Sequence, residues 1–123
     1  MKGLNRVVLV GNLGKDPVTK TLDDGREVAK VSVATTDIFR LKDGSNHADT
    51  QWHTVIFWGS LAALARSFLK KGSLVYVEGK IRTRTYLDSS GEKRYVTEVI
   101  GDRLVMLDRP QRRREEDELE MLF

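Results

Sequence analysis

The sequence predicts an all-β domain in which five strands close into a barrel, with one helix between the third and fourth strands. Three features predict this fold. Short runs of apolar and polar residues are bounded by turn residues, one segment changes to a helical period, and two long runs contain an internal glycine. Glycines inside long strands are expected where the strands must curl, and a curled sheet buries its edges by closing on itself.

The strand-like runs are separated by clear turn signals. Asp23-Asp24-Gly25 and the segment 88–92 are typical turns, because aspartate and glycine tolerate unusual backbone angles. The segment 37–50 is expected to be a polar loop or hairpin tip centred on "KDGSN". The β-patterned runs are 6–13, 18–22 (which leads into the first turn), 27–36, 51–58, 74–86 and 93–107.

The segment "SLAALARSFLKKG" is predicted to be the helix. Its apolar residues recur with helical spacing, from Leu61 to Leu69. Ser60 is the predicted N-cap, two lysines suit the negative end of the helix dipole, and Gly72 can end the helix. Five strands with a helix in this place form the arrangement of the oligonucleotide/oligosaccharide-binding (OB) barrel. An SH3-like barrel or a two-layer α+β sheet would give similar patterning.

The 123 residues suffice for one domain with a core, expected over 1–109, followed by a short charged tail over 110–123. The domain carries 18 Lys and Arg against 13 Asp and Glu, and the tail 3 against 5, so a basic body precedes an acidic end. Cysteine is absent, which fits a reducing cytosol. The N-terminus has only a four-residue apolar run, so we expect a cytoplasmic protein with neither signal peptide nor membrane helix.

Little in the sequence indicates catalysis. His47 and His53 are the only histidines, so a metal site or a nucleophile–base pair has few residues to draw on. "GNLGKD" (11–16) resembles a phosphate-binding loop, but the glycine spacing is wrong and Asp16-Pro17 follow the lysine instead of Ser or Thr. We therefore expect no enzyme, no cofactor and no metal.

The large aromatic residues are more informative. If 51–58 is a strand, Trp52 and Trp58 share the face opposite Val55 and Phe57. Such rings either cap the core or form an exposed apolar patch, which usually marks a binding site. The set also includes Phe39 and Tyr86, with the cations Lys71, Arg82 and Arg84 on or near the same strands.

Rings that alternate with cations suit single-stranded nucleic acid, whose unpaired bases stack on aromatics while its phosphates follow Lys and Arg. Stacking tolerates every base, so binding is expected to be independent of sequence. The predicted helix has few side chains that could contact bases in a duplex groove. The alternatives are an OB-fold adaptor of primosomal type, which acts through protein contacts, and a nucleic-acid enzyme.

Four stretches resemble the bacterial single-stranded DNA-binding protein family: "RVVLVGNLGKDP", "VATTDIFR", "QWHTVIFWGSLAALARSFLKKGSLVYVEGKIRTRTY" and "DSSGEKRYVTEVI". The resemblance covers residues 1–107. It implies an OB barrel, usually a homotetramer, that coats single-stranded DNA in replication, recombination and repair. The family's positions for base stacking fall on Phe39, Trp52, Trp58 and Tyr86, and those for the DNA backbone on Lys71, Arg82 and Arg84. His53 matches a position that resembles a subunit-contact residue.

The tail departs from the family pattern. Members usually have a long linker and an acidic tip with a proline and a terminal phenylalanine, whereas here "RPQRRR" leads directly into "EEDELEMLF". The resemblance implies a tip that binds replication and repair proteins, through Glu118, Glu120, Leu122 and Phe123. A short helix is the alternative, but its arginines and acids would oppose the helix dipole, so we expect a disordered tail.

Overall fold

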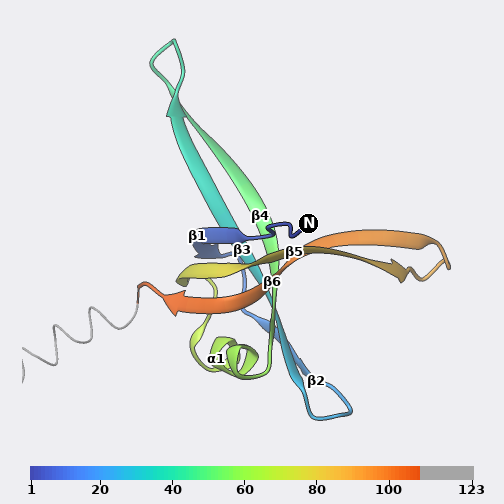
Figure 1. The fold of residues 1–123 in the computed structure, drawn as a ribbon. Coiled ribbons are helices and arrows are strands. Elements are labelled where there is room, and N and C mark those ends of the chain that lie inside the picture. Colours follow the sequence, from blue (N-terminus) through green and yellow to red (C-terminus); the bar gives the residue numbers. More distant parts are fainter. Residues whose placement is uncertain (109–123) are drawn as a thin grey trace, which may run out of the picture.

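The computed structural model describes residues 1–108, which form six strands and one helix (Figure 1). The strands are β1 (Val7–Leu13), β2 (Val18–Thr21), β3 (Glu27–Arg40), β4 (Asn46–Trp58), β5 (Leu74–Leu87) and β6 (Lys93–Met106). The helix, α1 (Ser60–Phe68), lies between β4 and β5.

Five of the strands close into a barrel. They follow the order β1, β5, β6, β4 and β3, and β3 pairs back onto β1 through Ala34 opposite Asn12. The pairing of β4 with β6 is parallel, whereas the other neighbours in the ring are antiparallel. The four-residue β2 pairs with β3 outside this ring. The predicted all-β, five-stranded OB barrel is confirmed. The helix follows β4, which is the third strand of the barrel along the chain because β2 lies outside the ring.

The core is formed by alternate residues of the long strands. Val31, Val55, Phe57 and Val77 are at most 1% exposed, because these positions share the inner face of the curled sheet. The ring of Phe57 lies against Gly101: a Cβ there would be 2.3 Å from Cε1 of the ring. The barrel therefore closes tightly only because this position carries no side chain.

The predicted irregularity at Gly79 is confirmed. Glu78 pairs with Arg103 and Gly79 with Gly101, so Asp102 is the extra residue of a β-bulge in β6. The bulge lets β5 and β6 bend from the barrel wall into a projecting hairpin.

The helix lies where the sequence predicts it, but Ser60 is not its N-cap. Gly59 takes that place with φ of 62°, and no side chain caps the first turn. A left-handed residue is needed to turn the chain sharply out of β4, and glycine adopts that geometry without strain. Ala62 and Ala65 bury the inner face of α1 against the barrel. At nine residues, α1 is far too short to cross a membrane, and no helix within residues 1–108 is long and apolar enough to do so.

Two hairpins project from the barrel in different directions (Figure 1). Pairing of β3 with β4 continues as far as Arg40 opposite Asn46, so most of the segment 37–50 is strand and only its centre forms the predicted tip. Every residue from Thr36 to Trp52 is exposed, which explains why the sequence shows no apolar alternation there. The second hairpin, β5–β6, is paired as far as Leu87 opposite Lys93.

Candidate nucleic-acid interface

Trp52 lies on β4 where the β3–β4 hairpin leaves the barrel. It is 62% exposed, so it is not a core residue. The ring lies against Gly14, just after β1: a Cβ at Gly14 would be 2.3 Å from Cζ3 and 2.7 Å from Cη2 of the indole. Backbone therefore supports one part of the ring, while most of its surface remains open to solvent. A supported, exposed indole is suited to stacking on a flat ligand.

Trp58 lies six residues further along β4, on the same face as Trp52. It is 40% exposed, and the guanidinium of Arg26 lies 5.3 Å from its ring centroid. Arg26 itself is held by Asp24 through an Nε–Oδ2 contact of 2.7 Å. The second indole is thus accessible and carries a cation beside it.

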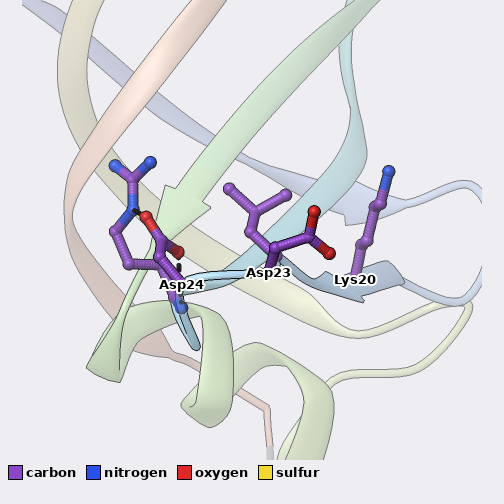
Figure 2. Close-up of a pocket in the computed structure, with 5 residues that line it drawn as sticks. Lys20, Asp23 and Asp24 are labelled. Atoms are coloured by element: carbon purple, nitrogen blue, oxygen red, sulfur yellow. Dashed lines mark hydrogen bonds and ion pairs between the residues drawn. The ribbon is translucent and has the colours of Figure 1, made fainter.

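A recess of about 320 Å³ lies beside this cation, on the turn between β2 and β3. Figure 2 shows the residues that line it. Lys20, Asp23, Asp24 and Arg26 line it together with Leu22. The backbone N–H and the side chain of Arg26 both donate to Asp24 and hold the pKa of that carboxyl below its usual value. Because two carboxylates face the two cations here, the recess is a poor site for an anion.

Tyr86, Arg82 and Arg84 share one face of β5, as the sequence predicts. Tyr86 is 45% exposed, and the guanidinium of Arg84 lies 5.9 Å from its ring centroid. The two arginines differ in their surroundings. Arg84 donates from Nε to Oε1 of Glu98 at 2.7 Å, whereas no ion pair involves Arg82 within residues 1–108. Arg82 lies opposite Glu98 in the strand register, but its guanidinium is not held in a direct ion pair there.

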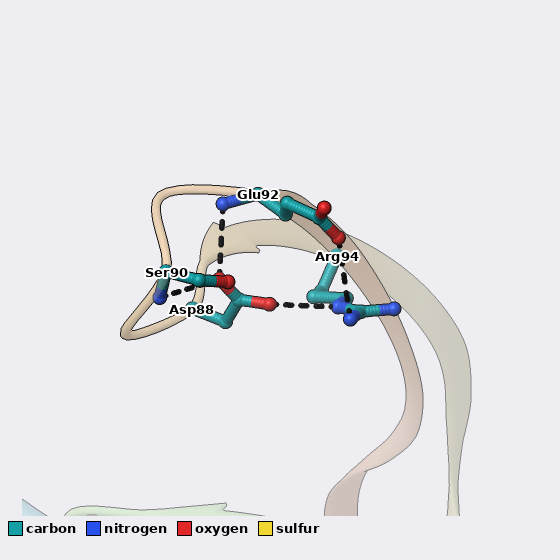
Figure 3. Close-up of polar contacts among 4 residues, drawn as sticks. All are labelled: Asp88, Ser90, Glu92 and Arg94. Carbon is teal, nitrogen blue, oxygen red and sulfur yellow. Dashed lines mark hydrogen bonds and ion pairs between the residues drawn. The ribbon is translucent and has the colours of Figure 1, made fainter.

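The tip beyond Tyr86 is ordered by Asp88 (Figure 3). Its carboxylate accepts hydrogen bonds from Nε of Arg94 at 2.9 Å, from the hydroxyl and N–H of Ser90, and from the N–H of Glu92. These contacts, chiefly that of Arg94, lower the pKa of Asp88 to about 2. The carboxylate is thus ionised at neutral pH and keeps β5 and β6 in register near Tyr86.

Phe39 and Lys71 lie apart from this set. Phe39 is 47% exposed near the tip of the β3–β4 hairpin, with its ring centroid 5.0 Å from that of His47 on the opposite strand. Alternation along β3 assigns it to the face that carries Val33, not to the face of Trp52. Lys71 is exposed after α1, and its backbone N–H donates to Asp16, two residues beyond Gly14. Its loop therefore lies near the support of Trp52.

His53 is half-buried at the base of the same hairpin, where its Nε2 lies 2.8 Å from the hydroxyl of Thr35. The residues predicted to bind partners lie outside the described residues: Glu118, Glu120, Leu122 and Phe123. Within residues 1–108, acidic and histidine side chains form no group of three that could hold a metal ion.

Several residues of this surface escape sequence reasoning. Gly14 looks like a turn residue, and its contact with Trp52 depends on the closure of the barrel. Glu98 sits in an alternating run, without any signal that it pairs with Arg84. Tyr95 is 69% exposed with Nζ of Lys93 at 5.8 Å from its ring centroid, although alternation along β6 would assign it to the same face as the core residue Val99.

Comparisons with known proteins agree on one family. The model of the Single-strand binding protein family matches residues 4–107. Single-stranded DNA-binding protein 1 of Xylella fastidiosa (strain 9a5c) is 46% identical over 112 residues, which are 90% of this chain and 82% of that protein. The Single-stranded DNA-binding protein of Xanthomonas axonopodis pv. citri is 43% identical over 106 residues, which are 86% of this chain and 59% of that protein.

A solved structure described as Plasmodium falciparum SSB complex with ssDNA has a TM-score of 0.76 and 33% identity to this chain. The alignment covers 88% of this chain and 98% of that one. The similarity therefore extends over most of this chain. This chain belongs to the single-strand binding protein family.

Proposed function

We propose that this protein binds and protects single-stranded DNA, independently of base sequence, in replication, recombination and repair. The observation that carries the proposal is the exposure of Trp52 and Trp58 on one face of β4, at 62% and 40%, in a barrel that also buries Phe57 completely. Large rings left open on a protein with a good core mark a binding surface. The relatives named above support DNA as the ligand.

The mechanism combines stacking with neutralisation of phosphates. Unpaired bases stack on the four rings, each contributing about 1–3 kcal/mol whichever base is present. The DNA backbone follows the cations. The stacking residues are Phe39, Trp52, Trp58 and Tyr86, and the cations are Lys71, Arg82 and Arg84.

The positions of the rings suggest the route of the DNA. Trp52 and Trp58 lie on β4 and Tyr86 on β5, so one strand of DNA that meets all three must cross from one hairpin to the other. Phe39 is on the other face of the β3–β4 hairpin, so a strand that reaches it passes around the hairpin's edge.

The proposed role is binding rather than catalysis, since the family is one of binding proteins. The primosomal type of adaptor is the less favoured function, because a structure similar over 88% of this chain is described as a complex with ssDNA. We place the DNA-binding domain at 1–109 and a charged tail at 110–123, and we propose that the protein works in the cytoplasm on the nucleoid.

The protein is proposed to assemble as a homotetramer, with His53 at a subunit contact. The half-buried position of His53 at the base of a hairpin supports such a role. Light scattering on the purified protein should give about four times the chain mass of 14.0 kDa. A mass equal to that of one chain would contradict the tetramer.

The acidic tip is proposed to recruit replication and repair proteins through Glu118, Glu120, Leu122 and Phe123. The terminal ring and the acids suit a basic, hydrophobic pocket. Replacing Phe123 with alanine should reduce the capture of such proteins while DNA binding is retained. Unchanged capture would exclude this residue from the contact.

Titration with an oligothymidine, followed by tryptophan fluorescence, tests the DNA-binding function. Bases that stack on Trp52 and Trp58 should quench their emission at low salt, and added salt should reverse the quenching. An oligoadenosine should also bind, since stacking does not depend on the base. Absence of quenching at low salt would contradict the proposal.

A further inference from the structure

Glu98 is a buried carboxylate beside the proposed DNA path. It is 5% exposed, and its Oε1 accepts a hydrogen bond from Nε of Arg84 at 2.7 Å. Glu98 also lines a recess of about 360 Å³ together with Trp52 and Thr54. The carboxylate is therefore close both to a ring and to a cation of the proposed binding set.

The ion pair affects both partners. A buried carboxylate is costly unless it is paired, and Arg84 provides the pairing charge. In return, the charge of Glu98 offsets that of Arg84. A phosphate that approaches the free edge of this guanidinium is attracted by it and repelled by the carboxylate on its other side. Arg82 lies opposite Glu98 in the register of β5 and β6 but makes no ion pair among residues 1–108, so its charge is offset less than that of Arg84.

We infer that Glu98 neutralises Arg84 toward the DNA backbone and thereby lowers the affinity for single-stranded DNA. Arg82, rather than Arg84, is then the main phosphate ligand on β5. Glu98 sets how tightly the protein holds DNA although the carboxylate itself does not touch it. The inference rests on the proposed DNA-binding function.

The variant Glu98→Gln tests the inference. Glutamine keeps an oxygen that can accept from Arg84 but removes the negative charge. In oligothymidine titrations at several salt concentrations, it should bind roughly three- to tenfold more tightly at low salt. Its plot of log K against log salt should be steeper by up to about 0.7, the value for one phosphate on a single strand.

Glu78→Gln is the matched control. Glu78 pairs with Arg6 at 3.0 Å and with Arg103 at 3.8 Å, so the change in chemistry and net charge is the same, but neither arginine belongs to the proposed DNA set. The control should gain much less affinity than Glu98→Gln. Equal gains, or an affinity of Glu98→Gln equal to wild type, would overturn the inference.

A double variant provides a second test if Glu98→Gln does not fold, as judged by the loss of a cooperative unfolding transition. Arg84→Met combined with Glu98→Gln replaces the ion pair by neutral side chains, a change that proteins often tolerate. It should lose less affinity for oligothymidine than Arg82→Met does, because the ion pair that it removes carries no net charge, whereas Arg82→Met removes a positive charge. A double variant as weak as Arg82→Met would overturn the inference. If the wild-type protein itself fails to bind oligothymidine, the DNA-binding proposal fails. If the wild-type protein binds but the variants do not differ as expected, only the inference about Glu98 is rejected.

Discussion

The indole of Trp52 rests on the backbone of Gly14, so closely that a Cβ at residue 14 would be 2.3 Å from the ring. Trp52 is on β4 and Gly14 directly follows β1, and they meet because Ala34 of β3 pairs with Asn12 of β1 and with Trp52 of β4. Gly14 therefore acts as a platform that holds an exposed ring in one place.

Gly14→Ala should displace the ring of Trp52 and weaken binding of single-stranded DNA, by up to the 1–3 kcal/mol of one base stack. Thermal unfolding should change little, because the ring is mostly exposed. The control is Gly3→Ala, since nothing lies within 4 Å of a Cβ at Gly3. Fluorescence titrations of both variants measure the effect, and equal affinities would contradict the platform.

Trp52→Ala should lower the affinity for oligothymidine by about 1–3 kcal/mol with little change in the free energy of unfolding. Phe57→Ala, on the opposite face of β4 and 0% exposed, should instead destabilise the fold by about 3–5 kcal/mol. Chemical denaturation and DNA titration of each variant separate the two roles. A Trp52→Ala protein that unfolds would mean that the ring caps the core.

Arg82→Met should make the plot of log K against log salt shallower by about 0.7, because one phosphate contact is lost. Arg66→Met removes the same charge from α1, where Arg66 pairs with Glu27 at 3.4 Å, and should leave the slope nearly unchanged. If both variants changed the slope equally, net charge and not position would control binding.

The tip of the β5–β6 hairpin should lose order in acid. The pKa of Asp88 is about 2 in the folded protein, below its ordinary value of 3.8, so the folded state favours the ionised form. The resulting stabilisation is present above pH 3.8 and is lost as the pH falls through about 2. Amide exchange of Ser90 and Glu92, measured by NMR, should accelerate over this range.

Asp88→Asn should show the faster exchange already at neutral pH, because an amide cannot replace the charged acceptor of Arg94. An acid response that persists in Asp88→Asn would show that another group controls the tip. Exchange in β1, remote from this turn, serves as the internal reference.

Local patterns in the sequence predict much of the fold. The helical spacing of Leu61 to Leu69 predicted α1, and the alternation around Val31 and Val33 predicted β3, because each element buries one face along its own length. The sequence predicts a polar loop or hairpin tip over 37–50, whereas the structure extends β3 and β4 through most of this segment. Its strands leave the core, so neither face is buried and the period of two disappears from the sequence.

The sequence by itself determined which residues share a face: two tryptophans opposite Phe57 on one strand, and two arginines on the same side as Tyr86 on another. Side-chain alternation is a property of a single strand, so parity is enough to assign them. Only the tertiary structure decided how these residues are supported and neutralised. The contacts of Trp52 with Gly14 and of Arg84 with Glu98 join different strands, and they form only when the barrel closes and β5 pairs with β6.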